Sequence, residues 1–234
     1  MATIINIETS SKTCSVALTK DGVVEFQLED TDGMNHAVKL APFVERCMDE
    51  VKRKEYRLDA VAVSLGPGSY TGLRIGLSLA KGLAYSLDVP LIGISTLQIL
   101  AVKAMFRSMN WQGDEFLVPM VDARRMEVFS GAFDFALNEV VAEGPVILDE
   151  SSFSELHTKR KVLFFGDGAS KFKDVYAAEN GEWLDGLNPH ARDMMALSEK
   201  YFRENRFIDI AYSTPNYLKE YQTTVPKNKV LNNN

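Results

Sequence analysis

The sequence predicts an α/β protein made of two related halves, and two observations carry this prediction. In Leu58–Thr96 an apolar run of strand length is followed by a Gly-Pro-Gly turn, a long helical segment of small and apolar residues, and a second apolar run. This order is typical of a strand–helix–strand crossover in a parallel sheet. The second observation is a repeat: an apolar strand, an acidic residue and a polar turn occur at Thr3–Ser11 and again at Phe116–Arg125. The repeat indicates a duplicated fold with two halves that face each other.

The first strands form a predicted meander. Strands are expected at Thr3–Ile7, Cys14–Thr19 and Val23–Leu28, with a hairpin turn at Asp21-Gly22 because that pair tolerates positive φ. Glu8 follows the first strand, where a carboxylate can hold a metal or orient a nucleotide phosphate. The alternative is an ordinary solvated turn carboxylate.

The remaining elements follow from hydrophobic periodicity and turn residues. In the first half we predict helices at Asn35–Lys54, Tyr70–Leu87 and Thr96–Met109 and strands at Ala60–Leu65 and Leu91–Ile94. In the second half we predict strands at Phe116–Val121, Met126–Phe135 and Lys161–Phe165, a short helix at Ser151–His157 capped by Ser151 or Ser152, and helices at Ser170–Ala178 and Arg192–Asn205. The polar turn at Trp111–Asp114 suggests domains at residues 1–110 and 111–222, and the polar residues 223–234 are predicted to be a flexible tail.

The Tyr70–Leu87 helix has an unusual face. Gly72, Gly76, Ala80 and Ala84 recur every four residues and form one ridge, with Gly82 nearby. A ridge without side chains lets another backbone approach closely, either this chain's own sheet or a helix of another chain. We predict that this helix and the Asn35–Lys54 helix form the main protein interface. Its residues would be Val44, Tyr70, Leu73, Gly76, Leu77, Ala80 and Ala84.

The loop before that helix is a candidate anion site, because a glycine-rich turn that opens a helix offers free N–H groups and a positive dipole end. The Walker A pattern is absent, since Leu73 follows Gly72 where the motif needs lysine. If the protein is a phosphotransferase or ATPase, we expect Glu8, Ser69 and Asp122 to bind the nucleotide.

Composition narrows the function classes. The 234-residue chain has 46% hydrophobic and 25% charged residues and a formal net charge of −6. An acidic chain binds nucleic acid poorly by itself, because phosphate contacts need clustered Lys and Arg. Cys14 and Cys47 have no disulfide or metal-type spacing and are expected to be buried, and the three histidines form no metal-binding pair. With no signal peptide and no apolar run of membrane-spanning length, we expect the cytoplasm.

Four segments resemble the bacterial TsaB (YeaZ) family. They are INIETSS (residues 5–11), SLGPGSYTGLRIGLSLAKGLA (64–84), PLIGISTL (90–97) and VDARRMEV (121–128). The similarity is close from residue 4 to about residue 128 and thinner afterwards. The family's C-terminal E-P-x-Y-L-R motif is present as TPNYLK (214–219), with Thr214 for Glu and Lys219 for Arg.

The resemblance implies the actin/Hsp70/sugar-kinase-like (ASKHA) duplicated fold, with two mixed β-sheet halves and flanking helices. It also implies a role in forming N6-threonylcarbamoyladenosine at position 37 of tRNAs that read codons starting with A. The implied partners are the catalytic paralogue TsaD, of the glycoprotease-like family, and the ATPase TsaE. From the resemblance we expect contact with tRNA only through the complex, self-association as a homodimer in isolation, and ATP or ADP only in the assembled complex.

One comparison with the paralogue indicates a non-catalytic subunit. TsaD resembles this chain around Pro90–Ala101 but has a His-x-x-x-His metal pair, which aligns here with Thr96 and Leu100. Leucine cannot ligate a metal and threonine is a poor ligand, so we expect no tightly bound metal and no catalytic residues. The alternatives are an actin-fold ATPase or phosphotransferase and, as older glycoprotease labels suggest, a metallopeptidase.

Overall fold

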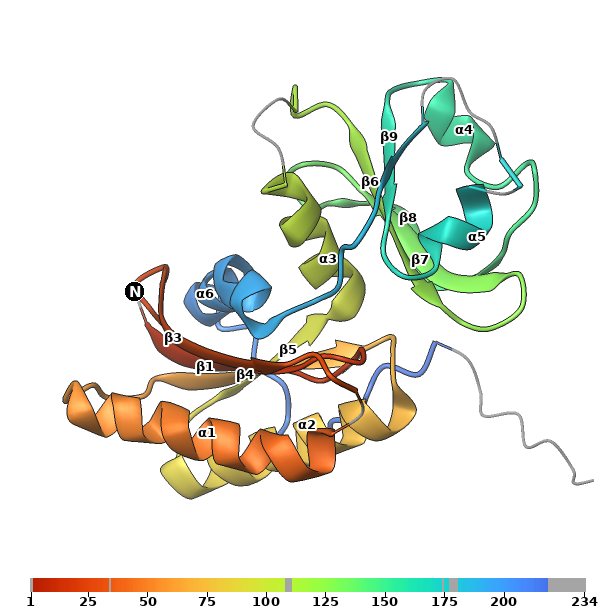
Figure 1. Ribbon diagram of the computed structural model, residues 1–234. Coiled ribbons are helices and arrows are strands. Elements are labelled where there is room, and N and C mark those ends of the chain that lie inside the picture. Colours follow the sequence, from red (N-terminus) through yellow and green to blue (C-terminus); the bar gives the residue numbers. More distant parts are fainter. Residues whose placement is uncertain (1, 34, 108–110, 174, 177–180, 219–234) are drawn as a thin grey trace, which may run out of the picture.

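The computed structural model describes residues 2–33, 35–107, 111–173, 175–176 and 181–218, and these residues form two β-sheets (Figure 1). The first sheet has five strands in the order β3-β2-β1-β4-β5. Its strands are β1 (Thr3–Glu8), β2 (Cys14–Lys20), β3 (Val23–Asp30), β4 (Ala60–Gly66) and β5 (Leu91–Ser95). β1, β2 and β3 pair antiparallel, whereas β1, β4 and β5 run parallel. The predicted meander and crossover are confirmed.

The second sheet repeats this order as β8-β7-β6-β9-β10. Its strands are β6 (Phe116–Asp122), β7 (Glu127–Phe133), β8 (Glu139–Ile147), β9 (Val162–Phe165) and β10 (Gly181–Leu184). β6 takes the place of β1: it lies in the middle, antiparallel to the strand after it and parallel to β9. The shared topology confirms the predicted duplicated fold.

The helices differ between the halves. The 18-residue helices α1 (His36–Arg53) and α2 (Tyr70–Leu87) lie side by side on one face of the first sheet (Figure 1). In the same places, the described residues of the second sheet's half form the short helices α4 (Ser154–His157) and α5 (Ala169–Lys173). The other face of the first sheet is covered by α3 (Thr96–Met105), which also packs on β6, and by the 3-10 helix η1 (Ala191–Met194) with α6 (Met195–Arg203).

Local sequence explains the helix boundaries in the first half. The hydroxyl of Ser69 accepts from the Gly72 N–H and caps α2, and Ser95 caps α3 in the same way through Leu97 N–H. α2 ends at Asp88, which adopts the left-handed conformation at its C-cap. α1 buries His36, Leu40, Val44, Cys47 and Val51. Val38 lies outside this stripe and is 71% exposed.

The second half departs most from the predictions. β8 and β10 were not predicted, because β8 contains Gly144 and Pro145 and faces solvent along much of its length, while β10 has only four residues. α4 begins after Phe153, in the left-handed conformation, so its predicted serine cap is wrong. The Ser151 and Ser152 hydroxyls bond to Asp149 instead.

The chain after the second sheet returns to the first half, contrary to the predicted second domain of residues 111–222. Ala191 N–H donates to Ser15 Oγ, and Ile208 bridges to Leu91 of β5. Lys81 Nζ then donates to the carbonyls of Ala211 and Ser213. The boundary near residue 111 thus separates the two sheets, while the predicted tail at 223–234 lies outside the described residues. Among the described helices, none has the length and apolarity needed to cross a membrane.

Candidate functional site

The turn after β1 begins with a buried carboxylate, Glu8. Glu8 is fully buried, and its Oε1 accepts from Ser10 N–H at 2.5 Å while Oε2 has no hydrogen-bond partner among the described residues. Burial raises the pKa of Glu8 above its ordinary value, against the lowering effect of the Ser10 hydrogen bonds. Glu8 is therefore not the solvated turn carboxylate that the sequence left open.

The glycine loop after β4 closes over this turn. Ser69 N–H donates to the Ser10 carbonyl at 2.6 Å, and the Ser69 hydroxyl is engaged in capping α2. A Cβ added to Gly68 would lie 2.2 Å from the same Ser10 carbonyl oxygen. The loop's glycine and Ser69 therefore hold the Glu8 turn, and the donors expected for a bound anion are partly used within the protein.

The small-residue ridge of α2 packs against this turn as well. A Cβ on Gly72 would lie 2.2 Å from the Thr9 carbonyl oxygen, and one on Gly76 would lie 2.2 Å from Thr9 Oγ1. Of the predicted interface residues, Val44, Leu73, Gly76, Leu77, Ala80 and Ala84 are all buried within the chain. The close approach expected from a second helix is thus made by this chain's own β1 turn, and the ridge itself is not a free surface. Tyr70 alone of the set is exposed, at 41%.

The turn after β6 occupies the equivalent place in the second half but is open. Asp122 accepts from Arg124 N–H at 2.6 Å and from Lys171 Nζ at 2.5 Å, and its own N–H donates to Asp167 Oδ1. Partial burial raises the pKa of Asp122, but the bonds from Lys171 and Arg124 outweigh it and hold the pKa below its usual value. Asp122 is a charged carboxylate at the surface.

The two turns meet across a cavity of about 20 Å³ between the halves. Ser10 and Thr96 line it from the first half, and Val121 and Asp167 line it from the second. The hydroxyls of Ser10 and Thr96 are buried without a hydrogen-bond partner among the described residues. This volume suits one water molecule, whereas a nucleotide needs a pocket of roughly 300 Å³ or more. None of Glu8, Ser69 and Asp122 lines this cavity, which is too small to hold a nucleotide.

The C-terminal residues 214–218 lie beside α2. Asn216 N–H donates to the Leu65 carbonyl, and Tyr217 OH accepts from Arg74 Nε at 2.8 Å. The Arg74 guanidinium also lies 3.9 Å from the Tyr70 ring centroid. The altered TPNYLK motif therefore lies along the start of α2, with Lys219 outside the described residues.

A second site was missed by the sequence analysis. Lys103, Arg107 and Arg192 all line a cavity of about 360 Å³ at the junction of α3 with η1. The four-residue spacing of Lys103 and Arg107 was a usable signal, since it places both on one side of a helix. Arg192 could not be added from sequence, because it is distant in the chain.

This architecture defines a class: a duplicated actin-like α/β protein whose interdomain turns face each other. Two solved structures from Pseudomonas aeruginosa share the architecture closely. "YeaZ from Pseudomonas aeruginosa" is 26% identical with a TM-score of 0.76, covering 93% of this chain and 100% of that one. A protein described by its "similarity to peptidase YEAZ" is 26% identical with a TM-score of 0.80, covering 94% and 100%.

The sequence comparisons identify the family. The Bacillus subtilis (strain 168) "tRNA threonylcarbamoyladenosine biosynthesis protein TsaB" is 34% identical over 93% of this chain and 94% of its own length. The protein of the same name from Escherichia coli (strain K12) is 29% identical over 92% and 94%. The family model described as "TsaD: tRNA N6-adenosine threonylcarbamoyltransferase" matches residues 32–230. The chain belongs to the TsaB (YeaZ) family, as its sequence motifs indicated.

Proposed function

We propose that this protein is a non-catalytic subunit of the machinery that forms N6-threonylcarbamoyladenosine in tRNA, and that it acts by binding and stabilising a TsaD paralogue. The observation that carries the proposal is the similarity, over most of both chains, to relatives named as TsaB biosynthesis proteins. TsaE, ATP or ADP, and tRNA at position 37 belong to the proposed assembly rather than to the isolated chain.

The chemistry of the interdomain turns supports a non-catalytic role. Glu8, in the place of the first-turn acid of actin-like enzymes, is buried and held by Ser10. At the positions aligned with the paralogue's histidines, both on α3, Leu100 packs in the apolar core and Thr96 offers one hydroxyl. Neither position supplies a strong metal ligand.

The surface available for pairing is the outer helix face, defined here by Val38 of α1 and by Ser78, Gly82 and Tyr85 of α2. All four residues are exposed, with Val38 at 71% and Tyr85 at 80%. A Cβ on Gly82 would meet nothing within 4 Å, so this glycine, unlike Gly76, leaves space for a second helix. In isolation the same face would pair with its own copy as an isologous dimer that buries about 1,000 Å² or more.

The test is co-purification with the TsaD paralogue from the same organism, using Gly82→Leu. The added side chain enters open space in the monomer but would separate two helices packed at this point, so we expect loss of the complex with retained folding. Gly144→Leu is the matched control, because Gly144 also has nothing within 4 Å of its Cβ position and lies on β8 of the other half. A full-strength complex with Gly82→Leu would place the interface elsewhere.

The enzymatic alternatives need a separate assay. Purified chain, free of its partners, is incubated with ATP and with a peptide substrate. We expect neither to be hydrolysed. Turnover that is lost in Glu8→Gln or Asp122→Asn would instead support an ATPase at the interdomain turns.

A further inference from the structure

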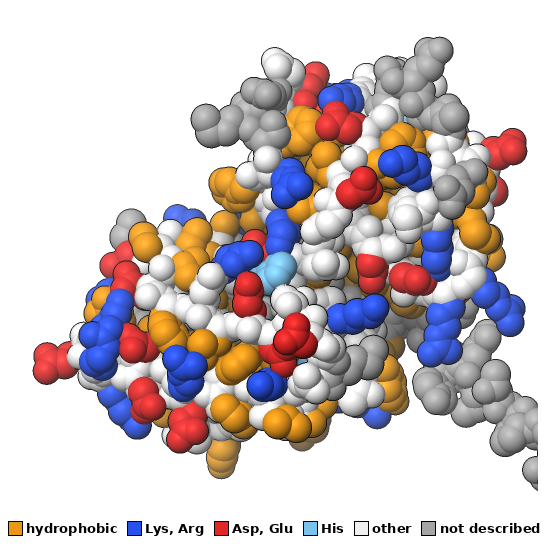
Figure 2. All heavy atoms as spheres, viewed as in Figure 1, with side chains coloured by type: hydrophobic (Ala, Val, Ile, Leu, Met, Phe, Trp, Pro, Cys, Tyr) orange, Lys and Arg blue, Asp and Glu red, His pale blue; other side chains and the backbone are white. Residues whose placement is uncertain are grey.

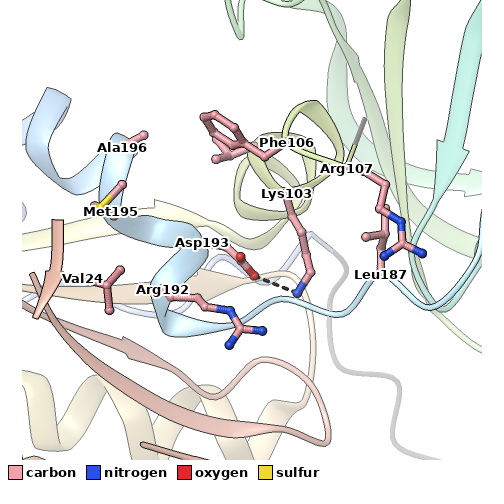
Figure 3. Close-up of a pocket in the computed structure, with 10 residues that line it drawn as sticks. Val24, Lys103, Phe106, Arg107, Leu187, Arg192, Asp193, Met195 and Ala196 are labelled. Atoms are coloured by element: carbon pink, nitrogen blue, oxygen red, sulfur yellow. Dashed lines mark hydrogen bonds and ion pairs between the residues drawn. The ribbon is translucent and has the colours of Figure 1, made fainter. Parts of the chain in front are cut away.

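The cavity missed by the sequence analysis lies where the two halves join, beside α3, η1 and β3. This waist pocket has a volume of about 360 Å³ and is lined on different sides by Lys103, Phe106, Arg107, Leu187, Arg192 and Met195 (Figure 3). Its volume falls within the usual range of small-molecule sites. It is separate from the water-sized cavity at the Glu8 turn, which has about 20 Å³.

One side of the waist pocket is cationic. Lys103 Nζ is paired with Asp193 at 3.0 Å and also donates to the Asn188 carbonyl at 2.7 Å, so this lysine is held in place. Arg192 forms an ion pair with Glu29 at 3.5 Å. Arg107 is exposed and has no acidic partner among the described residues. The charged residues that line the pocket are three cations, Lys103, Arg107 and Arg192, and one anion, Asp193, so the lining has a net positive charge on a chain whose overall charge is −6.

The other side is apolar and carries an aromatic ring. Phe106 is 78% exposed, next to Arg107 at the end of α3. In Figure 3 the Phe106 ring, Met195 and Ala196 lie at one end of the pocket, whereas the charged ends of Lys103 and Arg192 point toward the other. Figure 2 shows Lys and Arg side chains gathered at the same junction of the two halves. The pocket is thus divided into a cationic part and an apolar part.

A ligand that matches both parts has an anionic group joined to a planar apolar body. Guanidinium groups bind phosphate through paired N–H donors, and an exposed aromatic ring stacks on any base. We propose that the waist pocket binds a nucleotide unit, with its phosphate at the cationic side chains of the pocket and its base against Phe106. The unit belongs either to a free mononucleotide or to an RNA strand, and the site stands independently of the pairing proposed above.

The experiment titrates ¹⁵N-labelled protein with three probes: inorganic phosphate, adenosine 5′-monophosphate and a single-stranded RNA tetranucleotide. We expect the monophosphate to shift the amides of residues 102–107 and 192–196 and to bind about tenfold more tightly than inorganic phosphate, since stacking of one base contributes that order of affinity. Tighter binding of the tetranucleotide than of the monophosphate assigns the site to RNA. Equal or weaker binding assigns it to free nucleotide.

Two variants separate the parts of the site. Arg107→Ala is expected to weaken the binding of both inorganic phosphate and adenosine monophosphate by about tenfold, because a charged hydrogen bond is lost. Phe106→Ala is expected to weaken the binding of adenosine monophosphate and to leave the affinity for inorganic phosphate unchanged. Arg57→Ala is the matched control, an exposed arginine after α1 that does not line the pocket.

Three results would overturn the proposal. The first is an absence of binding by both the monophosphate and the tetranucleotide at millimolar concentration. The second is a set of shifts at residues 8–11 and 66–72 instead of the waist pocket. The third is equal affinity for phosphate and monophosphate together with no effect of Phe106→Ala, which would leave only an anion site without base recognition.

Discussion

The two halves share one strand order, yet the turn at the end of the central strand is buried in the first half and exposed in the second. In the first half Glu8 is fully buried beneath the glycine loop and α2. In the second half Asp122 is exposed and paired with Lys171. A Gly-x-Gly loop lies beside each turn: Gly66–Gly68 in the first half and Gly166–Gly168 in the second. The first glycine of each loop has a φ near 100°. The same Gly-x-Gly loop conformation therefore lies beside a buried turn in one half and beside an exposed turn in the other.

The difference is explained by the helix that each loop opens. α2 has 18 residues and presents Gly72 and Gly76 to Thr9, so the helix reaches van der Waals contact with the turn. α5 has five residues and carries Lys171 to Asp122 instead of covering it. Close packing of glycine backbone closes the first turn, whereas a charged pair that keeps contact with solvent occupies the second. Four predictions test this comparison.

Gly76→Leu should have the largest effect. Its Cβ would lie 2.2 Å from Thr9 Oγ1, and Thr9 is fully buried. We expect a loss of about 3 kcal/mol or more in the free energy of unfolding, measured by urea denaturation. Gly82→Leu on the same helix should instead retain or gain up to about 1 kcal/mol, from helix propensity. Equal stability of the two variants would show that α2 does not pack as described.

Gly68→Ala and Gly168→Ala compare the two loops directly. At Gly68 the new Cβ would meet the Ser10 backbone at 2.2 Å with a φ of 156°, so we expect a loss of about 3 kcal/mol. At Gly168 the nearest atom is a side-chain atom, Val128 Cγ1, at the longer distance of 2.8 Å, so a loss of about 1 kcal/mol is expected. Thermal unfolding of the two variants compares their losses of stability. A larger loss for Gly168→Ala than for Gly68→Ala would contradict the prediction.

Glu8→Gln should stabilise the folded protein at neutral pH. Burial raises the pKa of Glu8, so the folded state favours the protonated form and loses this contribution as the pH rises above the unfolded pKa of about 4.3. Each unit of that rise corresponds to about 1.4 kcal/mol, which the neutral amide avoids. Urea denaturation at pH 5 and pH 7.5 should show a smaller gain at the lower pH. A gain that does not change with pH would mean that Glu8 titrates normally.

Asp122→Asn should have the smallest effect and the opposite sign. The pKa of Asp122 is lowered, so its contribution is present above the unfolded pKa of about 3.9 and is lost as the pH falls through the folded value. Because the Asp122 side chain is 44% exposed, solvent screens the pair with Lys171 and the loss should stay below about 1 kcal/mol. Stability measured in low and high salt checks this, since only a screened ion pair weakens with salt.

The sequence by itself determined the strand and helix positions of the first half, where periodicity is strong and the Gly-Pro-Gly turn is unambiguous. α2 was predicted with its observed bounds, Tyr70–Leu87. The sequence also showed the repeat of Glu8 and Asp122 and the family motifs. β8 and β10 escaped prediction because an exposed strand containing Gly144 and Pro145, or one of four residues, has no clear hydrophobic period.

Only the tertiary structure decided what the small residues and the acids do. The ridge of Gly72 and Gly76 predicts close approach, but whether the approaching backbone belongs to this chain depends on where β1 ends, and the fold places Thr9 there. Glu8 and Asp122 have the same place in the repeated pattern, yet their burial depends on helices of different length packed from elsewhere in the chain. The waist pocket likewise unites Arg107 and Arg192, which are far apart in sequence. Spacing along a chain fixes local structure, whereas contact and desolvation come from segments that meet only on folding.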